Sequence, residues 1–161
     1  MGLKAYREKR NFRKTSEPAG ESGQKKIRKP KELLFVIQRH QASHLHFDLR
    51  LEESGVLKSW AIPKEPPRSE GIRRLAVQVE DHPLEYAGFE GTIPKGEYGA
   101  GTVRIWDKGS YVPEETTPFK RVFEIKGRIL RGTYGLIKLK GREPEDRNWL
   151  FFKLKGGSPE D

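Results

Sequence analysis

The chain has 161 residues, of which 34% are hydrophobic and 34% are charged, and it contains no cysteine. This length is enough for one domain with a buried core, or for one domain with a tail. The lack of cysteine excludes disulfides, thiolate metal sites and a cysteine nucleophile. No apolar run approaches the length of a membrane span, and the first twenty residues lack the apolar centre of a signal peptide. We therefore expect a cytoplasmic protein that has no membrane partner.

The formal net charge of +9 predicts a polyanionic partner, most simply nucleic acid. Residues 1–31 hold 11 Lys and Arg against 3 Asp and Glu, a net charge of +8. Residues 32–161 hold 21 against 20, a net charge of +1. This difference predicts a basic N-terminal arm over 1–31 and a nearly neutral body over 32–161. An arm of this charge would contact the phosphate backbone and make binding sensitive to salt.

The arm itself has two parts. Leu3, Tyr6 and Phe12 have a spacing that predicts a short amphipathic helix docked on the body. Residues 18–31 are rich in Gly, Ser, Pro and Lys. This composition fits a solvated, disordered tail as well as it fits an arm that contacts phosphate. The arm is therefore predicted to be partly ordered.

The body favours strands. Residues 33–40 form a short apolar run, and residues 44–51 alternate strictly between apolar and polar side chains, which predicts a half-buried strand. Further strands are predicted between Gly, Pro and Asp residues, at 58–62, 73–80, 102–112, 119–127, 131–141 and 148–156. Many short strands with few helical periods predict a mainly β fold, a compact antiparallel β-barrel with short flanking helical elements.

Residues 82–101 contain five glycines and two prolines and are predicted to form a long loop, too irregular for a helix. The loop lacks the Gly-Lys-Ser/Thr of a phosphate-binding P-loop and precedes a strand, so its glycines are expected to serve turns and close backbone approach. Trp60, Trp106 and Trp149 lie in strand patterns and are predicted to anchor the core.

Three of the four histidines, including His40 and His46, fall within seven residues, and Asp48 and Arg50 continue the strand face of His46. Side chains at alternate strand positions project to one side, about 6–7 Å apart. Imidazole and carboxylate ligands suit Mn, Fe or Zn, so this face predicts an open metal site, with a hydrogen-bonded structural pair as the alternative. His44 shares the face and is interpreted as a group that either packs or supports the ligands from behind.

Each of the other groups near this face has more than one interpretation. The Arg50 fork suits a phosphate, or else a salt bridge to Asp48 or Glu52. His82 could be a general acid, a third metal ligand or a turn cap, and Tyr86 is more often packed than catalytic. Two further cations bracket a proline-rich segment, where charge is usually solvated: Lys64 and Arg74.

Two long strings, FVIQRHQASHLHFDLRLEESGVLKSWAIPK and RRLAVQVEDHPLEYAGFEGTIPKGEYGAGTVRIWDKG, resemble the phosphoesterase domain of bacterial DNA ligase D and its free-standing relatives. The resemblance covers nearly the whole chain, from the arm element YREKRNFRKTSEPAG to the final strands. A length of 161 residues leaves no room for the polymerase and ligase modules that accompany this domain in DNA ligase D. We therefore expect the stand-alone form, with a DNA ligase or repair polymerase acting in trans.

The resemblance implies a manganese-dependent hydrolase that heals DNA 3′ ends. Such an enzyme acts as a phosphodiesterase that removes a 3′-terminal ribonucleoside. It then acts as a phosphomonoesterase that removes the remaining 3′-phosphate and leaves a 3′-hydroxyl for repair or ligation. The implied substrates are DNA or RNA-tipped DNA 3′ ends in a primer–template, the implied cofactor is Mn²⁺, with Zn²⁺ or Co²⁺ as alternatives, and a monomer is expected.

The resemblance also assigns roles by motif. The implied metal ligands are His40, His46 and Asp48. The implied phosphate-contacting and catalytic residues are Arg50, Lys64, Arg74, Glu80, His82 and Tyr86. In the arm, Arg10 and Glu17 match positions that complete the site and contact the substrate. Asn11 stands where the family pattern has an aspartate, which removes one acidic group from the arm.

In the implied mechanism, the metal ion binds a phosphate oxygen, and Arg50, with Lys64 or Arg74, neutralises charge in the transition state. His82 donates a hydrogen bond or a proton, and Tyr86 orients a non-bridging oxygen.

Two other functions stay open. One is a nucleic-acid-binding barrel without catalysis. The other is an iron oxygenase that uses His46, Asp48 and His82 as a two-histidine, one-carboxylate triad. Phosphate release from a 3′-phosphate end in Mn²⁺ supports the esterase, and binding without release supports the module. Iron-dependent turnover of 2-oxoglutarate would support the oxygenase.

Overall fold

The computed structural model describes residues 3–12, 14–18, 32–140 and 146–155. Within these ranges the elements, in chain order, are α1 (Lys4–Glu8), β1 (Leu33–Gln41), β2 (Leu45–Glu53), β3 (Val56–Ile62), β4 (Arg73–His82), the 3₁₀ helix η1 (Leu84–Gly88), β5 (Gly91–Ile93), β6 (Gly101–Thr117), β7 (Lys120–Gly127), β8 (Arg131–Lys138) and β9 (Asn148–Lys153). No helix in these ranges has the length and apolar character needed to cross a bilayer. The predicted tail at 18–31 lies, beyond residue 18, outside the described residues.

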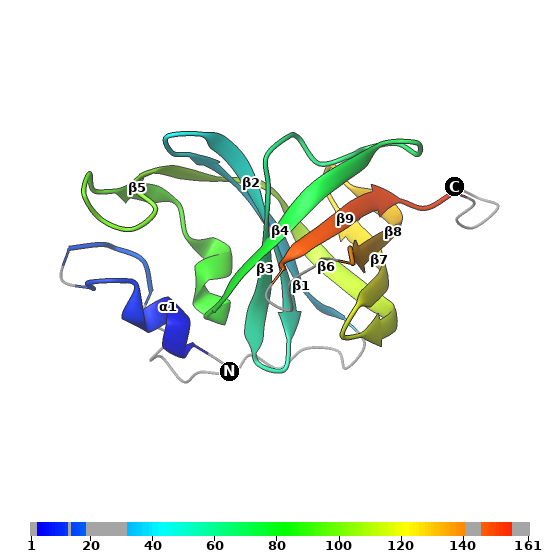
Figure 1. Cartoon of the computed structure of the whole chain (residues 1–161), viewed down its shortest axis with the longest axis horizontal. Helices are drawn as coiled ribbons and strands as arrows, with labels where there is room; N and C mark the ends of the chain where they lie inside the picture. Colours follow the sequence, from blue (N-terminus) through cyan, green and yellow to red (C-terminus); the bar gives the residue numbers. More distant parts are fainter. Residues whose placement is uncertain (1–2, 13, 19–31, 141–145, 156–161) are drawn as a thin grey trace.

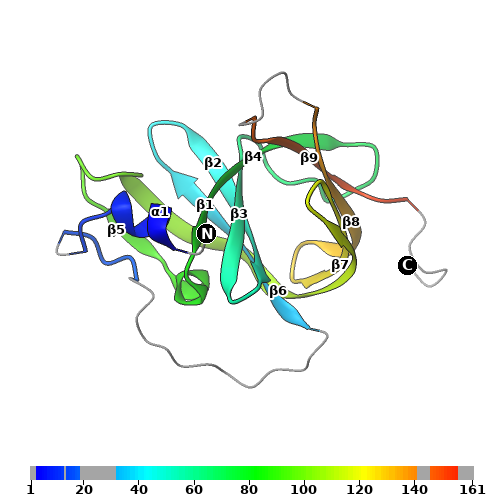
Figure 2. The same cartoon turned by 60° about the horizontal axis from the view of Figure 1, so that its bottom comes forward.

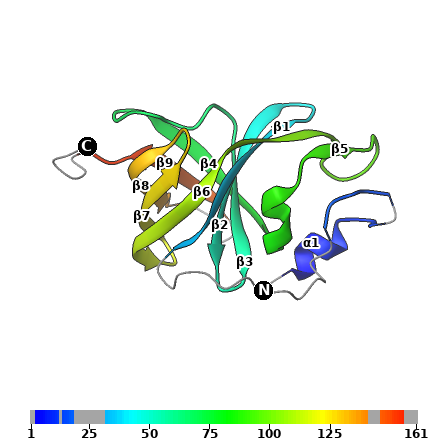
Figure 3. The same ribbon diagram turned by 180° about the vertical axis from the view of Figure 1, so that it is seen from behind.

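Antiparallel pairing closes the sheet into a barrel (Figure 1). The strand order is β1-β2-β3-β4-β9-β8-β7-β6, and β6 pairs back with β1, so eight strands form a ring. β5 extends the sheet beside one end of β6, as the reverse view in Figure 3 shows. Closure pairs the strand edges that an open sheet would expose. The mainly β antiparallel barrel with short helical elements, predicted from the sequence, is confirmed.

The barrel interior is filled by the inward-facing side chains of the strands. Trp60 and Trp149 are 0% and 2% exposed, and their rings meet edge to face with centroids 5.5 Å apart. Trp106 is half-buried against the same core and contacts Phe47 edge to face. Large aromatic side chains contribute much of the apolar surface that such a small core buries. The predicted role of the three tryptophans is thus confirmed, with Trp106 at the margin of the core.

A second apolar cluster lies outside the barrel, where α1 and η1 cover the sheet. Its buried members are Tyr6, Leu57, Tyr86, Phe89, Ile93 and Val103. Tyr6 of α1 is fully buried, its hydroxyl donates to the Pro18 carbonyl, and Phe12 packs beside it. Figure 2 shows α1 and β5 on one side of the molecule, away from β7 and β8. The predicted docking of an amphipathic helix is confirmed for this part of the arm.

Two stretches differ from the sequence prediction. Residues 82–101, predicted to be one loop, contain η1 and the short strand β5, which pairs with β6. β6 also continues to Thr117, beyond the predicted end at residue 112. The predicted end lies just before Pro113, which has no N–H to donate. The register of β6 against β7 shifts between Pro113 and Glu115, and this irregularity accommodates the proline within the strand.

Candidate active site

The hairpin of β1 and β2 brings together a group of potential metal ligands. Its register places His40 directly opposite His46, and Gln38 opposite Asp48. Cross-strand partners project from the same face of the sheet. One ligand atom from each of His40, His46 and Asp48 lies within 4.8 Å of the others. His46 Nε2 is 3.2 Å from Asp48 Oδ1, and His40 Nδ1 is 3.6 Å from Asp48 Oδ2.

The outer nitrogen of each imidazole is held by a backbone carbonyl. His40 Nε2 donates to the Gly99 carbonyl at 2.7 Å, and His46 Nδ1 donates to the His44 carbonyl at 3.3 Å. A carbonyl only accepts, so the outer nitrogens carry the ring protons and the inner ones present lone pairs, as in metal-binding histidines. Gly99 has φ +76°, where other residues are strained, although a Cβ there would make only ordinary contact with His40 Cε1, at 3.5 Å. This glycine therefore serves a turn, as predicted.

Because lone pairs and a carboxylate converge here, the cluster needs a cation, which is either a proton or a metal ion. Burial by itself would lower the pKa of His46, but the hydrogen bond to Asp48 and its charge outweigh burial and raise that pKa above 6.5. Burial would raise the pKa of Asp48, but hydrogen bonds from His40 and His46, which form when an inner ring nitrogen carries a proton, and the Arg50 charge hold it well below its usual range. Two imidazoles and one carboxylate suit a divalent first-row metal ion.

Arg50 lies beside this cluster and is 3% exposed. Its Nε donates to Gln38 Oε1 at 2.6 Å, and Nη2 lies 3.4 Å from Asp48 Oδ2. The guanidinium stacks on the Tyr86 ring, 4.7 Å from the ring centroid. Nη1 is buried, and within the described part of the chain it has no hydrogen-bond partner. The predicted salt bridge to Asp48 is therefore present, and one charged donor remains for a ligand.

His82, at the end of β4, is buried and stays outside the metal cluster. Its Nδ1 donates to the Glu80 carbonyl at 2.9 Å, so its Nε2 lone pair faces Arg10 Nη2 at 3.3 Å. Burial, together with the charges of Arg50 and Arg10, lowers the pKa of His82 well below 6.5. His82 is therefore a neutral hydrogen-bond acceptor at pH 7.

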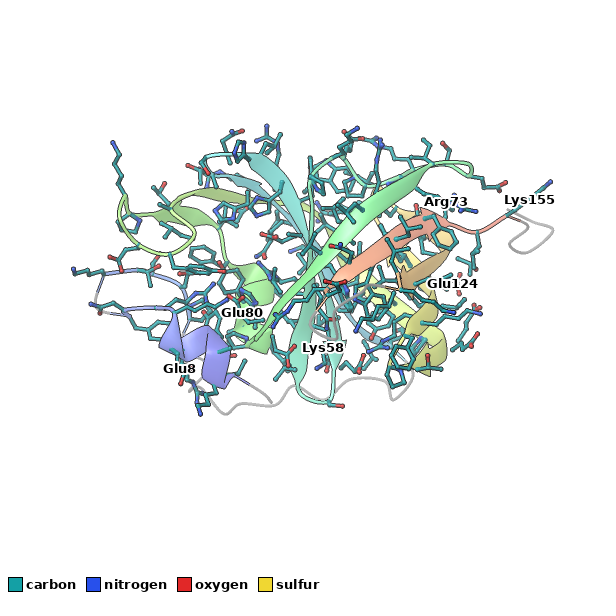
Figure 4. The ribbon with its side chains drawn as sticks, in the orientation of Figure 1. Glu8, Lys58, Arg73, Glu80, Glu124 and Lys155 are labelled. Carbon is teal, nitrogen blue, oxygen red and sulfur yellow. The ribbon has the colours of Figure 1, made fainter. Side chains whose placement is uncertain are left out.

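The arm forms one wall of the site through a buried ionic network. Arg10 Nε lies 2.9 Å from Glu17 Oε2, and Arg10 Nη1 lies 3.1 Å from Glu80 Oε2. Lys9 Nζ lies 3.0 Å from the other oxygen of Glu80, and the Tyr86 hydroxyl donates to Glu17 at 2.6 Å. Figure 4 labels Glu80 on β4, beside α1. The arm thus contributes paired charges to the site, in addition to its basic surface.

Most of these groups line one open cleft of about 280 Å³. All the residues predicted for the site line it except Lys64 and Arg74. Lys64 is exposed in the segment after β3, and Arg74 Nε donates to the Glu65 carbonyl at 2.8 Å. Their contact with substrate stays a prediction. The side chain of Asn11 is exposed and does not line the cleft.

Sequence reasoning missed several residues of the site. Gln38 was assigned to an apolar run, although its position two residues before His40 placed both on one strand face. Tyr98 and Gly99 reach the cleft from the glycine-rich loop, and Ser59 Oγ lies 3.4 Å from His82 Nδ1. No local pattern marks these three, because their partners are distant in the sequence.

Comparison with known proteins identifies the family of this cleft-bearing barrel. The family model of the DNA ligase D 3′-phosphoesterase domain matches residues 38–138. The chain is 44% identical over 167 residues to the multifunctional non-homologous end joining protein LigD of Pseudomonas aeruginosa, covering 96% of this chain and 19% of that protein. It is 44% identical over 173 residues to the LigD protein of Mycolicibacterium smegmatis, covering 99% of this chain and 22% of that protein.

A third relative is the LigD protein of Mycobacterium bovis, which is 49% identical over 125 residues, covering 75% of this chain and 16% of that protein. The chain therefore spans about a fifth of the length of these curated relatives. The matched region of the family model contains, from Gln38 onward, both strands of the hairpin that carries His40, His46 and Asp48, together with His82 and Tyr86. This chain belongs to the DNA ligase D 3′-phosphoesterase domain family.

Proposed function

We propose that this chain is a metal-dependent phosphoesterase that heals DNA 3′ ends. Its diesterase step would release a 3′-terminal ribonucleoside, and its monoesterase step would remove the remaining 3′-phosphate. One observation carries the proposal: the ligand cluster of His40, His46 and Asp48 adjoins the buried Nη1 of Arg50, which lacks a partner among the described residues. The chain's membership of the family, and its similarity to proteins named for non-homologous end joining, support a role in DNA end processing.

The charge of the cleft supports a requirement for metal. Two cationic side chains, Arg10 and Arg50, and three anionic ones, Glu17, Asp48 and Glu80, line it. With neutral imidazoles these five lining groups sum to one negative charge, and Lys9, which pairs with Glu80 from outside the lining, brings the sum to zero. A divalent ion makes the balance positive. Phosphate binding should therefore depend on the metal ion, since the fixed charges do not favour an anion.

His40, His46 and Asp48 would hold Mn²⁺, or Zn²⁺ or Co²⁺ in its place, and the bound ion would supply Lewis-acid polarisation of a phosphate oxygen. Arg50 Nη1 would donate to the phosphate and stabilise the charge of the transition state. Water oxygen forms a bond to phosphorus, the bond to the leaving oxygen breaks, and one water proton ends on that leaving oxygen.

Two residues depart from their expected roles. The Nε2 lone pair of neutral His82 fits a proton or hydrogen-bond acceptor better than the donor expected from the sequence. The Tyr86 hydroxyl donates to Glu17. Tyr86 would therefore contribute to phosphate binding through its ring, which lies against the Arg50 guanidinium. Lys64 and Arg74 are proposed to contact the DNA strand beyond the cleft.

The direct test is phosphate release from a primer–template that carries a 3′-phosphate on the primer. The protein with Mn²⁺ should release inorganic phosphate and leave a primer that a polymerase extends. A primer with a 3′-terminal ribonucleotide tests the diesterase step by release of the nucleoside. A duplex with only a 5′-phosphate and a reaction with EDTA serve as controls. DNA binding without any hydrolysis in Mn²⁺, Zn²⁺ or Co²⁺ would instead support a non-catalytic binding module.

The structure does not favour the oxygenase alternative in the form predicted. Among the described residues, the cluster contains His40 and excludes His82, whose Nε2 faces the Arg10 guanidinium. We propose that the chain acts as a monomer in the cytoplasm and supplies 3′-hydroxyl ends to a DNA ligase or a repair polymerase.

A further inference from the structure

Gln38 makes three side-chain hydrogen bonds next to the cleft, although it does not line the cleft. It lies on β1, opposite Asp48 and two residues before His40, and it is 0% exposed. Its Nε2 donates to the carbonyl oxygens of Tyr86 at 2.7 Å and Phe89 at 3.0 Å. Its Oε1 accepts from Arg50 Nε at 2.6 Å. The amide thus connects β2 to η1 and to the residue that follows it.

The chemistry of the partners leaves one orientation for this amide. Arg50 Nε can only donate, so it requires the amide oxygen, and the two carbonyl oxygens can only accept, so they require the amide nitrogen. Turning the amide over would break all three hydrogen bonds in a buried place where no water replaces them. A glutamate at this position would set a carboxylate oxygen against two carbonyl oxygens. A methionine would fill the space but satisfy none of the three groups.

The position of the amide determines where the free donor of Arg50 points. The guanidinium is planar, so fixing the directions of Nε and Nη2 also fixes the direction of Nη1. Gln38 holds Nε, Asp48 lies 3.4 Å from Nη2, and the Tyr86 ring supports the face of the guanidinium. Nη1 is the nitrogen that remains buried without a partner in the described ranges. Gln38 also hydrogen-bonds the backbone of Tyr86, so one amide sets both the guanidinium and the ring beneath it.

We propose that Gln38 is a positioning residue for phosphate recognition: it aligns Arg50 Nη1 with the anion beside the metal cluster without touching the substrate itself. This proposal rests on the function proposed for the cleft. It separates two tasks that the hairpin performs on neighbouring residues. His40, His46 and Asp48 would bind the metal ion, and Gln38 would act through Arg50 on the anion alone. A change at Gln38 should therefore weaken phosphate binding far more than metal binding.

The test compares Gln38→Met and Gln38→Glu with wild type and with the matched control Gln78→Met. Gln78 lies on β4, outside the cleft lining, and accepts a hydrogen bond from Trp149 Nε1 at 3.2 Å. Four quantities are measured on each protein: the melting temperature, the Mn²⁺ dissociation constant, the dissociation constant of inorganic phosphate from the Mn²⁺-loaded protein by titration calorimetry, and kcat/KM for release of a 3′-phosphate. A fifth is solvent exchange of the Arg50 Nε–H proton, observed by NMR.

For Gln38→Met we expect kcat/KM to fall and the phosphate dissociation constant to rise, each by about 10- to 100-fold, the range for a lost hydrogen bond to a charged group. The Mn²⁺ dissociation constant should stay within about threefold of wild type, and exchange at Arg50 Nε should accelerate. Gln78→Met should leave phosphate binding unchanged. Gln38→Glu keeps the side-chain volume, and it should lose phosphate binding because a new negative charge neutralises the guanidinium. It serves as the test if the methionine variant does not fold.

The proposal is overturned if a folded Gln38 variant retains phosphate affinity, or if its Mn²⁺ and phosphate affinities fall equally. Failure of the proposed function looks different. In that case wild type itself releases no phosphate from a 3′ end. Phosphate affinity and Arg50 Nε–H exchange then still decide the role of Gln38, since both are measured without turnover.

Discussion

Arg10 and Glu80 lie 70 positions apart in the sequence and form a buried ion pair, with 3.1 Å between Nη1 and Oε2. The same guanidinium contacts Glu17, and the same carboxylate accepts from Lys9. The pair ties the segment around α1 to the end of β4, next to His82. Part of the basic arm is therefore internal to the site, and its cations are neutralised there by carboxylates.

Replacing Arg10 tests whether this pair holds the arm in place. Arg10→Met should lower the free energy of unfolding by about 3–5 kcal/mol, because it leaves two buried carboxylates without the guanidinium that compensates them. It should also lower kcat/KM for 3′-phosphate release, since one wall of the cleft loosens. Chemical denaturation and steady-state kinetics measure these effects. Lys14→Met, at an exposed position of the same segment, is the control and should match wild type. Equal stability of the two variants would contradict the prediction.

The ligand assignment predicts a sharp contrast between neighbouring histidines. His46→Ala should weaken Mn²⁺ binding by about 100-fold or more, because it removes a direct ligand where even indirect partners contribute 10- to 100-fold. It should abolish both esterase activities while the barrel stays folded. His44→Ala is the matched control, since the His44 side chain is exposed and lies outside the cluster. Titration calorimetry with Mn²⁺ measures the difference. Full manganese-dependent activity in His46→Ala would refute the assignment.

Arg50→Lys should lose activity despite keeping the positive charge. Lysine has no Nε–H to meet Gln38 and no planar fork, so it cannot hold one donor in place while it presents another. We expect kcat/KM to fall by about 100-fold, near the upper range for a lost charged hydrogen bond. Arg121→Lys provides the control, since Arg121 pairs with Glu53 away from the cleft. Steady-state kinetics compare the two, and similar losses would mean that the effect is not specific to the cleft.

His82 should make the metal-free protein less stable in mild acid. Its pKa in the folded protein lies well below 6.5, so below that pH the unfolded chain takes up a proton that the folded chain refuses. The unfolded state then binds more protons, and stability falls as the pH decreases from about 7 toward the folded pKa, by at most about 1.4 kcal/mol per pH unit. Above pH 7 this contribution is constant.

The measurement is urea denaturation between pH 7.5 and 5 for wild type, His82→Asn and the control His44→Ala. Subtracting the curves isolates His82 from His46, whose raised pKa gives a contribution of opposite sign. The loss of stability in acid should be smaller in His82→Asn and unchanged in His44→Ala. Parallel curves for wild type and His82→Asn would show that His82 is protonated as easily in the folded protein as in the unfolded chain.

Local patterns in the sequence predicted much of this molecule. Alternation over residues 44–51 placed His46, Asp48 and Arg50 on one face because side chains in a strand have a period of two. The same rule places Gln38 and His40 on one face of their strand, but residues 33–40 were interpreted by their apolar content alone. The short strands predicted a barrel, and the charge count located the basic arm. In each case the information lies within a few neighbouring residues.

The sequence by itself determined the types of the potential metal ligands, their shared strand face, the barrel class and the family motifs. Only the tertiary structure decided that the polar face of β2 is buried, with Asp48 and Arg50 covered and paired. It also decided that the Gly99 carbonyl orients His40, and that Arg10 reaches Glu80. These contacts join residues far apart in the chain, and they form because burial forces each polar group to find a partner wherever the fold supplies one. No periodic pattern encodes such a choice.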